Sequence, residues 1–425
     1  MSTHYQTTRL PSGLTVATAE MPDRASVSLG LWLGIGARYE PGALNGACHF
    51  IEHMLFKGTR RRSARQISQA VEGLGGYLNA FTGEESTCFF ARARHDHLEA
   101  LIEVLSDMLL HARLAPADVD RERNVIKEEL AMYLDQPQHQ VQELLNATLW
   151  PDQPLGRPLV GTPASLDRMD RDALLRFRRA HYTSGAAFLV AAGHVQHAEL
   201  VKVAGRYLRS LPAGARPVPS PAIERQQAPV VRLHTKATEQ TQIAIGFRTC
   251  SRHDPRRHAL RLLNTVLGEN MSSRLFQELR EDRGLAYSIY SSVTAFGDTG
   301  TLVISAGLDT ANVRPALRLI LKELGRVAAR APERHEFRRA RDYVLGQMDL
   351  GLENTENQMH WLGEQLVGHG RLISPATVRQ RLAAVTPADL RTVAGDFFRP
   401  ERLNLALVSP MESCRPLEPF LRRIS

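Results

Sequence analysis

The chain has 425 residues, of which 43% are hydrophobic and 23% are charged, and its formal net charge is +8. This length exceeds what one hydrophobic core usually serves, so we expect two or more domains of ordinary globular composition. No apolar run reaches the ~18 residues that a membrane helix needs. The N-terminal residues lack the basic and apolar segments of a secretory signal. We therefore expect a cytoplasmic protein without a membrane partner.

The positive charge does not by itself indicate a nucleic-acid partner. Most arginines alternate with acidic residues, as in residues 168–172, and the one tight run, Arg60–Arg62, has no interleaved aromatic residues. We expect no nucleic-acid binding. The four cysteines are far apart and form no CxxC pair, which argues against a disulfide framework and against a cysteine-built zinc site.

The first half of the chain alternates between strand and helix patterns. Residues 26–33 alternate polar and apolar side chains, as a half-buried strand does. The patterns that follow are helical at 45–57 and 67–74, strand-like at 77–81 and 86–93, and mainly helical at 96–149. This order predicts a sheet accompanied by helices.

A proline-rich segment divides the chain near its midpoint. Residues 210–221 contain four prolines, which disfavour both helix and central strand. We predict one domain at 1–209, a semi-rigid linker at 210–228 and a second domain at 229–425.

The second half repeats the order of the first. Its patterns are strand-like at 241–247, helical at 257–267 and 273–280, strand-like at 287–294 and 301–306, and then helical over long stretches. The hairpin residues Ala80–Gly83 resemble Ala295–Gly297 in composition and position. The sequence therefore predicts an α+β fold made by internal duplication, with two homologous domains that each pack a mainly antiparallel sheet against helices.

The first group of candidate catalytic and metal-binding residues lies in the segment His49-Phe50-Ile51-Glu52-His53. On a helix, positions i and i+4 lie about 40° apart, so His49 and His53 can direct two imidazoles at one metal ion. Zinc suits such a site because it accepts nitrogen and oxygen ligands and keeps one position open for water. Glu52 lies on the same side of the helix and can take a proton from that water.

A third ligand is expected from the helical segment 120–130. Glu122 and Glu129 are two turns apart and share one face, so either could bind zinc while the other orients a ligand histidine. Val125 and Ile126 lie between them, which predicts that this face turns inward. Each pattern alone also fits a solvated surface helix, whereas their joint occurrence favours a metal site.

The run Gly46–Thr59 resembles the active-site helix of the pitrilysin/insulysin-type (inverzincin, M16) zinc metallopeptidases, most closely the short-chain group of the mitochondrial processing peptidase and its bacterial relatives. In that family the third ligand is a glutamate about 76 residues after the second histidine, and 129 − 53 = 76 selects Glu129 over Glu128. Glu122 then matches the auxiliary glutamate. Cys48 stands where small apolar residues are usual. It could sensitise the site to oxidation, but a buried, inert thiol is the favoured interpretation.

The resemblance also implies substrate-binding residues. Residues 75–82 resemble the edge strand that captures extended peptides, which would place Asn79, Ala80 and Phe81 against substrate; without the resemblance they read as a plain hairpin strand. Arg280 and Tyr287 match the family's arginine–tyrosine pair in type and spacing. That pair contacts the substrate backbone, and the tyrosine could polarise the scissile carbonyl.

The same resemblance implies a zinc endopeptidase with one Zn²⁺ per chain, which is expected to cleave extended peptides inside a closed chamber. The second-half segment 262–268 matches the zinc helix but has no ligands, so the second domain is expected to be metal-free. Relatives in the family that the sequence resembles form the chamber from four α+β repeats. One chain supplies two, which favours a homodimer over a heterodimer with a metal-free paralogue. The alternative function is that of a non-catalytic structural or assembly subunit.

Overall fold

The computed structural model describes residues 3–422 and 424, which form two compact units. The first unit contains the residues up to Leu130 together with Pro158–Ser220 and Asp349–Leu372. The second contains Ala131–Arg157, Pro221–Met348 and the residues from Ile373 onward. The domains predicted from the sequence were the contiguous segments 1–209 and 229–425. Each compact unit also includes a helical segment from the other half of the chain.

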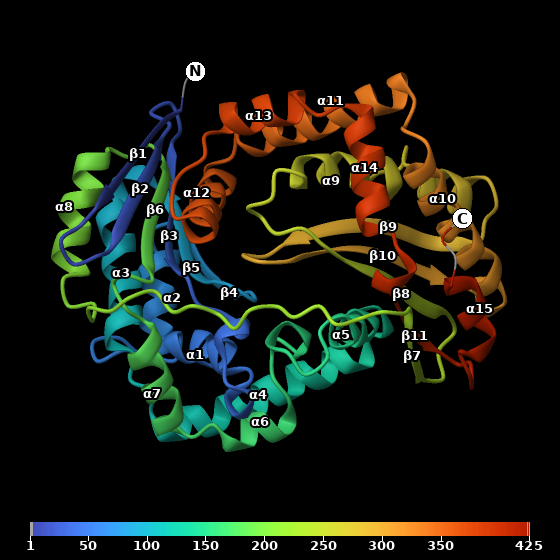
Figure 1. The fold of residues 1–425 in the computed structure, drawn as a ribbon. Helices are drawn as coiled ribbons and strands as arrows, with labels where there is room; N and C mark the ends of the chain where they lie inside the picture. Colours follow the sequence, from blue (N-terminus) through green and yellow to red (C-terminus); the bar gives the residue numbers. More distant parts are fainter. Residues whose placement is uncertain (1–2, 423, 425) are drawn as a thin grey trace. The chain divides into compact units, whose positions relative to one another are not determined.

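The first unit is built on a six-stranded sheet (Figure 1). Its strands are β1 (His4–Arg9), β2 (Thr15–Glu20), β3 (Ser26–Leu33), β4 (Tyr77–Thr82), β5 (Thr87–Arg94) and β6 (Ala187–Gly193). Their order across the sheet is β1-β2-β6-β3-β5-β4, and only β2 and β6 pair in parallel. Strand β4 therefore lies at an edge.

The second unit is built on a five-stranded sheet that repeats this plan. Its strands are β7 (Val230–Thr235), β8 (Thr241–Thr249), β9 (Ala286–Ala295), β10 (Gly300–Leu308) and β11 (Leu403–Ser409). The order β7-β11-β8-β10-β9 corresponds to β2-β6-β3-β5-β4, and β7 and β11 form the one parallel pair of this sheet. The matching order and strand directions confirm the predicted internal duplication and the α+β class.

Helices surround each sheet. Those of the first unit are α1 (Ala47–Leu55), α2 (Ala64–Glu72), α3 (Leu98–His111), α6 (Pro163–Arg168), α7 (Arg171–His181), α8 (His197–Tyr207), α12 (Thr355–His369) and most of α4 (Pro116–Asp135). Those of the second are α5 (Pro137–Leu149), α9 (Arg257–Asn264), α10 (Val313–Ala329), most of α11 (Arg334–Gly351), α13 (Pro375–Ala383), α14 (Pro387–Phe397) and α15 (Glu418–Leu421).

The helices predicted at 257–267 and 273–280 differ in detail from the observed ones. Helix α9 ends at Asn264 and continues as a π-helical turn, Thr265–Glu269. The second stretch is also π-helical, over Phe276–Glu281. The remaining strand and helix predictions agree with the structure apart from small shifts at element ends, and the residues from 213 to 229 form no helix or strand.

Helix α12 covers one face of the first sheet although it comes from the second half of the chain (Figure 1). Its buried residue Met359 accepts a hydrogen bond from Trp32 of β3 through its sulfur at 3.4 Å. A Cβ atom on Gly363 would lie 2.0 Å from the Trp32 ring, so only glycine permits this approach. Strand β3 was predicted to be half-buried, but it is buried on both faces because α12 covers the side that carries Ser28 and Trp32.

Helix α5 has the same relation to the second sheet although it comes from the first half of the chain. Its residues Val141, Leu145 and Leu149 recur at helical spacing and are buried against β8 and β11. A Cβ on Gly246 of β8 would lie 3.0 Å from the Leu145 side chain. Each sheet is thus covered on one face by a helix from the other half of the chain: the first sheet by α12 and the second by α5.

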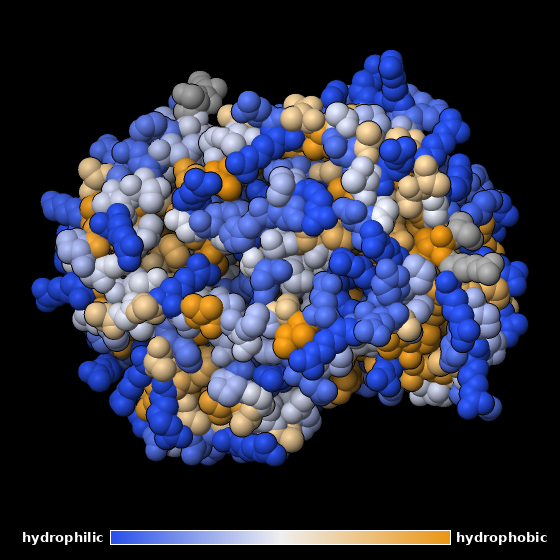
Figure 2. Space-filling model, in the orientation of Figure 1, coloured by the Kyte–Doolittle hydropathy of each residue, from blue (hydrophilic) through white to orange (hydrophobic). Residues whose placement is uncertain are grey.

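The surface is mixed in character. On the face shown in Figure 2, hydrophobic side chains form small separate patches among hydrophilic ones. Within the described residues no helix has the length and apolar character to cross a membrane.

Candidate metal centre

Helix α1 has one face that packs in the core and another that carries the two histidines. Phe50, Ile51, Met54 and Leu55 are fully buried and anchor the helix in the first unit. His49, which is 8% exposed, and the half-buried His53 lie on the remaining face, one turn apart, with ring centroids separated by 4.5 Å. The i, i+4 spacing therefore places the two imidazoles side by side, as the sequence predicted.

Helix α4 supplies the carboxylates. Glu122 is buried on the same face as Ile126, and Glu129 lies one turn further on with intermediate exposure. The prediction that this face turns inward is correct for Ile126 but wrong for Val125, which is 46% exposed. Val125 lies at the border of the buried stripe, where the helix also meets solvent.

Three potential ligand atoms converge between α1 and α4. Oε2 of Glu129 lies 3.8 Å from Nε2 of His49 and 3.6 Å from Nε2 of His53. These residues are the one group of metal-binding side chains found among the described residues, and their ligand atoms all lie within 4.8 Å of one another. Tetrahedral zinc with bonds of about 2.0–2.1 Å would require separations of about 3.3–3.5 Å. The set fits zinc with a small inward adjustment.

Glu122 contacts the ring nitrogen of His53 that is not directed at Glu129. Its Oε1 lies 2.9 Å from Nδ1 of His53, and its Oε2 accepts a hydrogen bond from Lys57 at 2.7 Å. Burial tends to raise the pKa of Glu122, but the hydrogen bonds from His53 and Lys57 lower it below its ordinary value. The ionised carboxylate favours the Nδ1–H tautomer of His53, which leaves Nε2 as the free ligand atom.

The protonation state of His49 also suits a ligand. Burial, followed by the electrostatic effect of the neighbouring His53, lowers the pKa of His49 to about 4, while Glu129 and Glu122 act in the opposite direction. Its imidazole is therefore neutral near pH 7, which is the form that binds metals. Its buried Nδ1 has no hydrogen-bond partner within residues 3–422 and 424.

Glu52 connects the metal centre to the edge strand. Thr82, the last residue of β4, donates a hydrogen bond of 2.5 Å to Oε2 of Glu52. Burial raises the pKa of Glu52, opposed by the Thr82 hydrogen bond and by His53. The carboxyl group is thus held beside the histidines and next to the end of β4.

The predicted substrate-binding residues lie on this edge strand. Asn79, Ala80 and Phe81 pair with β5 on one side, and no strand of the described part of the chain pairs with β4 on the other. The N–H of Ala80 bonds the side-chain oxygen of Asn79 at 2.8 Å instead of a neighbouring strand. A peptide could take over such a donor without disturbing the sheet.

Arg280 and Tyr287 belong to the second unit. The Arg280 guanidinium lies 6.0 Å from the centre of the Tyr287 ring, and it also stacks on Phe276 at 4.9 Å. Tyr287 is the second residue of the edge strand β9 and its side chain is exposed, at 75% for the residue. The two residues predicted to act together are therefore neighbours.

Sequence reasoning missed Glu40. The carboxylate accepts hydrogen bonds of 2.7 Å from the backbone N–H groups of both Gly46 and Cys48, and one of 3.2 Å from the Asn45 side chain. Helix α1 has no capping side chain at its own N-cap, so Glu40 fills that role from the preceding loop. Burial raises its pKa to about 7 although these hydrogen bonds lower it. A lone glutamate six residues before the N-cap residue Gly46 gives no recognisable capping pattern.

Cys48 lies in the first turn of α1 and is fully buried. Burial, together with the nearby Glu40 carboxylate, raises the pKa of its thiol well above the ordinary value. A protonated, inaccessible thiol is unreactive, which agrees with the expectation for this residue.

Comparisons with known proteins identify the family of the chain. Residues 15–163 match the family model of insulinase (peptidase family M16), and residues 168–344 match the model of the peptidase M16 inactive domain. A protein of Streptomyces coelicolor named as an uncharacterized zinc protease is 39% identical over 95% of this chain and 89% of its own length. A Bacillus subtilis protein, also named an uncharacterized zinc protease, is 32% identical over 94% of this chain and 97% of its own length. The chain therefore belongs to the M16 peptidase family.

Solved structures share the fold. A protease from Helicobacter pylori superimposes with a TM-score of 0.89 at 20% identity, covering 96% of this chain and 100% of the other. A peptidase M16 inactive domain from Pseudomonas fluorescens gives the same TM-score at 18% identity and covers 96% and 99% of the two chains.

Proposed function

We propose that this protein is a zinc-dependent endopeptidase that hydrolyses extended peptides or unfolded polypeptide segments. The observation that carries the proposal is the convergence of His49, His53 and Glu129 with Glu52 beside them. The two relatives are named as uncharacterized zinc proteases, and these names support the same class of reaction. One zinc ion per chain matches the one ligand group found within the described residues.

Each residue of the centre has a role in this proposal. His49, His53 and Glu129 would hold the ion, which when bound lowers the pKa of water and polarises the scissile carbonyl. Glu52 accepts a proton on its carboxylate and delivers it to the leaving amine. Glu122 keeps the ring of His53 in the ligand orientation by its hydrogen bond to Nδ1.

Strand β4 is the proposed substrate-binding element. Its unpaired edge ends at Thr82, which is bonded to Glu52, so a peptide added along Asn79–Phe81 would run toward the metal centre. Main-chain pairing makes little demand on side-chain identity, which suits varied extended substrates. Arg280 and Tyr287 are proposed to contact the substrate backbone, and a closed chamber would keep folded proteins out.

The test is Glu52→Gln measured with unstructured peptides. The amide occupies the same space but cannot accept a proton, so peptide hydrolysis falls by ~10²–10⁴ while zinc content is retained. Near-normal turnover at unchanged zinc content would refute Glu52 as the base. A wild-type protein that holds zinc but cleaves no unstructured peptide would favour the alternative function of a non-catalytic subunit.

A further inference from the structure

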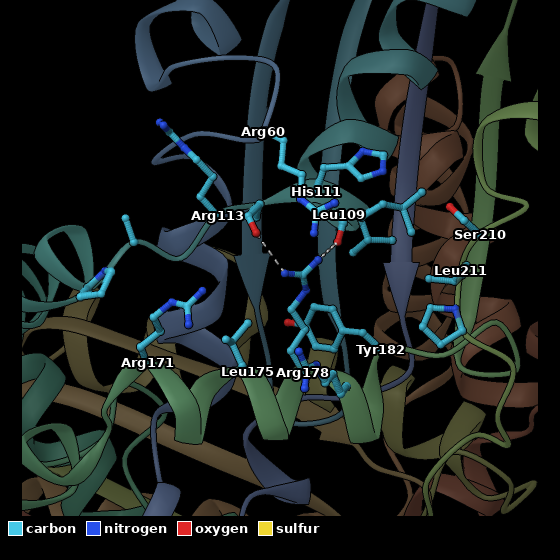
Figure 3. A pocket seen from close by; sticks show the side chains of 16 residues that line it. Arg60, Leu109, His111, Arg113, Arg171, Leu175, Arg178, Tyr182, Ser210 and Leu211 are labelled. Atoms are coloured by element: carbon cyan, nitrogen blue, oxygen red, sulfur yellow. Dashed lines mark hydrogen bonds between the residues drawn. The ribbon is translucent and has the colours of Figure 1, made fainter.

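A cavity in the first unit is lined by none of the proposed metal ligands. This cavity of about 720 Å³ is bordered by the end of α3, by α7 and by the segment that follows α8 (Figure 3). Its charged lining residues are all cationic or titrate to cations: Arg60, His111, Arg113, Arg171, Arg178 and Arg179. No aspartate or glutamate lines it among the residues that the structure describes. The size falls within the range of small-ligand sites.

The positive charge of this cavity is poorly compensated. Arg60, Arg178 and Arg179 form no ion pair with any described carboxylate. Arg178 donates instead to the carbonyl groups of Leu109 and Ala112 at the end of α3 (Figure 3). Such bonds satisfy N–H groups but do not neutralise the charge.

The two carboxylates that do contact lining residues leave most of this charge in place. His111 pairs with Asp107 at 3.1 Å, but Asp107 also bonds Arg62 and Thr59. Arg171 is 3.8 Å from the exposed Asp172, which is a weak contact in water. The lining of the cavity therefore carries more positive charge than the neighbouring carboxylates neutralise.

An unused donor points to a ligand independently of the charge. Tyr182 borders the cavity and is only 3% exposed, yet its hydroxyl has no hydrogen-bond partner among the described residues. Figure 3 shows the hydroxyl directed toward the Arg178 side chain. Leaving a buried hydroxyl unpaired is unfavourable, and two donors side by side would both be satisfied by one acceptor.

We propose that this cavity binds a small multivalent oxyanion, carrying phosphoryl or carboxylate groups. Arginine forks are the side chains best matched to such oxygens, and several of them here converge without a carboxylate partner. Arg178 and Tyr182 form the inner end of the site, and Arg60 and Arg179 supply exposed positive charge at its mouth. This site is independent of the peptidase proposal.

The test is isothermal titration calorimetry of the zinc-loaded protein with inorganic pyrophosphate and, separately, with citrate. The double variant Arg60→Gln/Arg179→Gln removes two cations that form no described side-chain hydrogen bonds, so the fold should survive. Arg9→Gln/Arg24→Gln is the matched control, because both residues are exposed, form no described ion pair and lie outside the lining. Chelation of zinc by either anion is common to all three proteins and cancels in the comparison.

We expect the control to bind like the wild type and the double variant to bind at least ~10-fold more weakly. Tyr182→Phe should also weaken binding while thermal stability stays near that of the wild type. Binding of pyrophosphate alone would assign a phosphoryl ligand, and equal binding of citrate a general oxyanion site. Affinity weaker than ~10 mM for both anions, or equal affinity in the double variant and the control, would overturn the proposal.

Discussion

Substitutions at Glu129 and at its neighbour Glu128 test the proposed ligand set directly. The two side chains are adjacent in the sequence but point in different directions. Glu129 directs Oε2 toward both histidines, whereas Glu128 is exposed on the next face of α4. Glu129→Gln should weaken zinc binding by ~10²-fold or more and abolish hydrolysis, because it removes a ligand and not merely a group that orients one. Glu128→Gln should change neither.

Competition with a chromogenic chelator measures both affinities on the same scale. If Glu129→Gln retains zinc as tightly as the wild type while Glu128→Gln releases it, the assignment of the third ligand is wrong.

Glu40 acts on the metal centre through the backbone. Glu40→Ala leaves the N–H groups of Gly46 and Cys48 without their acceptor, at a cost of ~1–3 kcal/mol for each buried donor. We expect a lower melting temperature and weaker zinc binding, since His49 follows directly on the released turn. Glu72→Ala, at an exposed glutamate without a described partner, is the control. Unchanged zinc affinity and stability in Glu40→Ala would show that the cap is dispensable.

At the scale of elements, the exchange of α5 and α12 distinguishes this chain from two independent domains. Each helix packs on the sheet formed mainly by the other half, and each meets a glycine at the contact. Neither half supplies by itself the helix that covers one face of its sheet. We therefore expect that fragments 1–209 and 229–425, expressed separately, would expose apolar sheet faces and aggregate.

Gly363 and Gly346 form a matched pair for this contact. Gly363→Ala would place a Cβ 2.0 Å from the Trp32 ring, so we expect destabilisation by ~1–3 kcal/mol from overpacking. Gly346→Ala, in the interior of α11 with no atom within 4 Å of its new Cβ, should stabilise the protein by ~0.5–1 kcal/mol. Chemical denaturation followed by tryptophan fluorescence measures both. A Gly363→Ala protein as stable as the wild type would mean that α12 does not pack tightly on β3.

At the scale of the whole molecule, we propose a homodimer in which each metal centre is completed by Arg280 and Tyr287 of the other chain. The chain contains two copies of the α+β unit, and carries both the ligand set and the arginine–tyrosine pair. It therefore needs no metal-free paralogue, although a heterodimer remains the alternative. A two-fold symmetric pair would create two such sites.

Complementation tests this assembly. Glu52→Gln and Tyr287→Phe proteins are each expected to be inactive, whereas mixed dimers formed by subunit exchange regain one intact site and recover activity. Exchange is followed by mass-tagged subunits, and the oligomeric state by light scattering. Absent recovery despite proven exchange, or a fully active monomer, would rule the homodimer out.

The duplicated α+β fold and the candidate metal-binding histidines were predictable from the sequence alone. Both are encoded locally, because strand and helix periodicities need only neighbouring residues and two histidines four positions apart on a helix must share a face. The spacing to Glu129 added the third ligand through the family resemblance. Tertiary structure then brought these atoms together.

Three features are visible only in the folded chain: which helix covers which sheet, the capping of α1 by Glu40, and the lining of one cavity by arginines from three separate segments. The apolar stripe of α5 or α12 fits any sheet face of matching width, so its partner is chosen by packing between residues that are distant in the sequence. The roles of Glu40 and Arg178 depend on the backbone groups they meet, which no pattern in the sequence marks. Long-range contacts of this kind have no periodic signature.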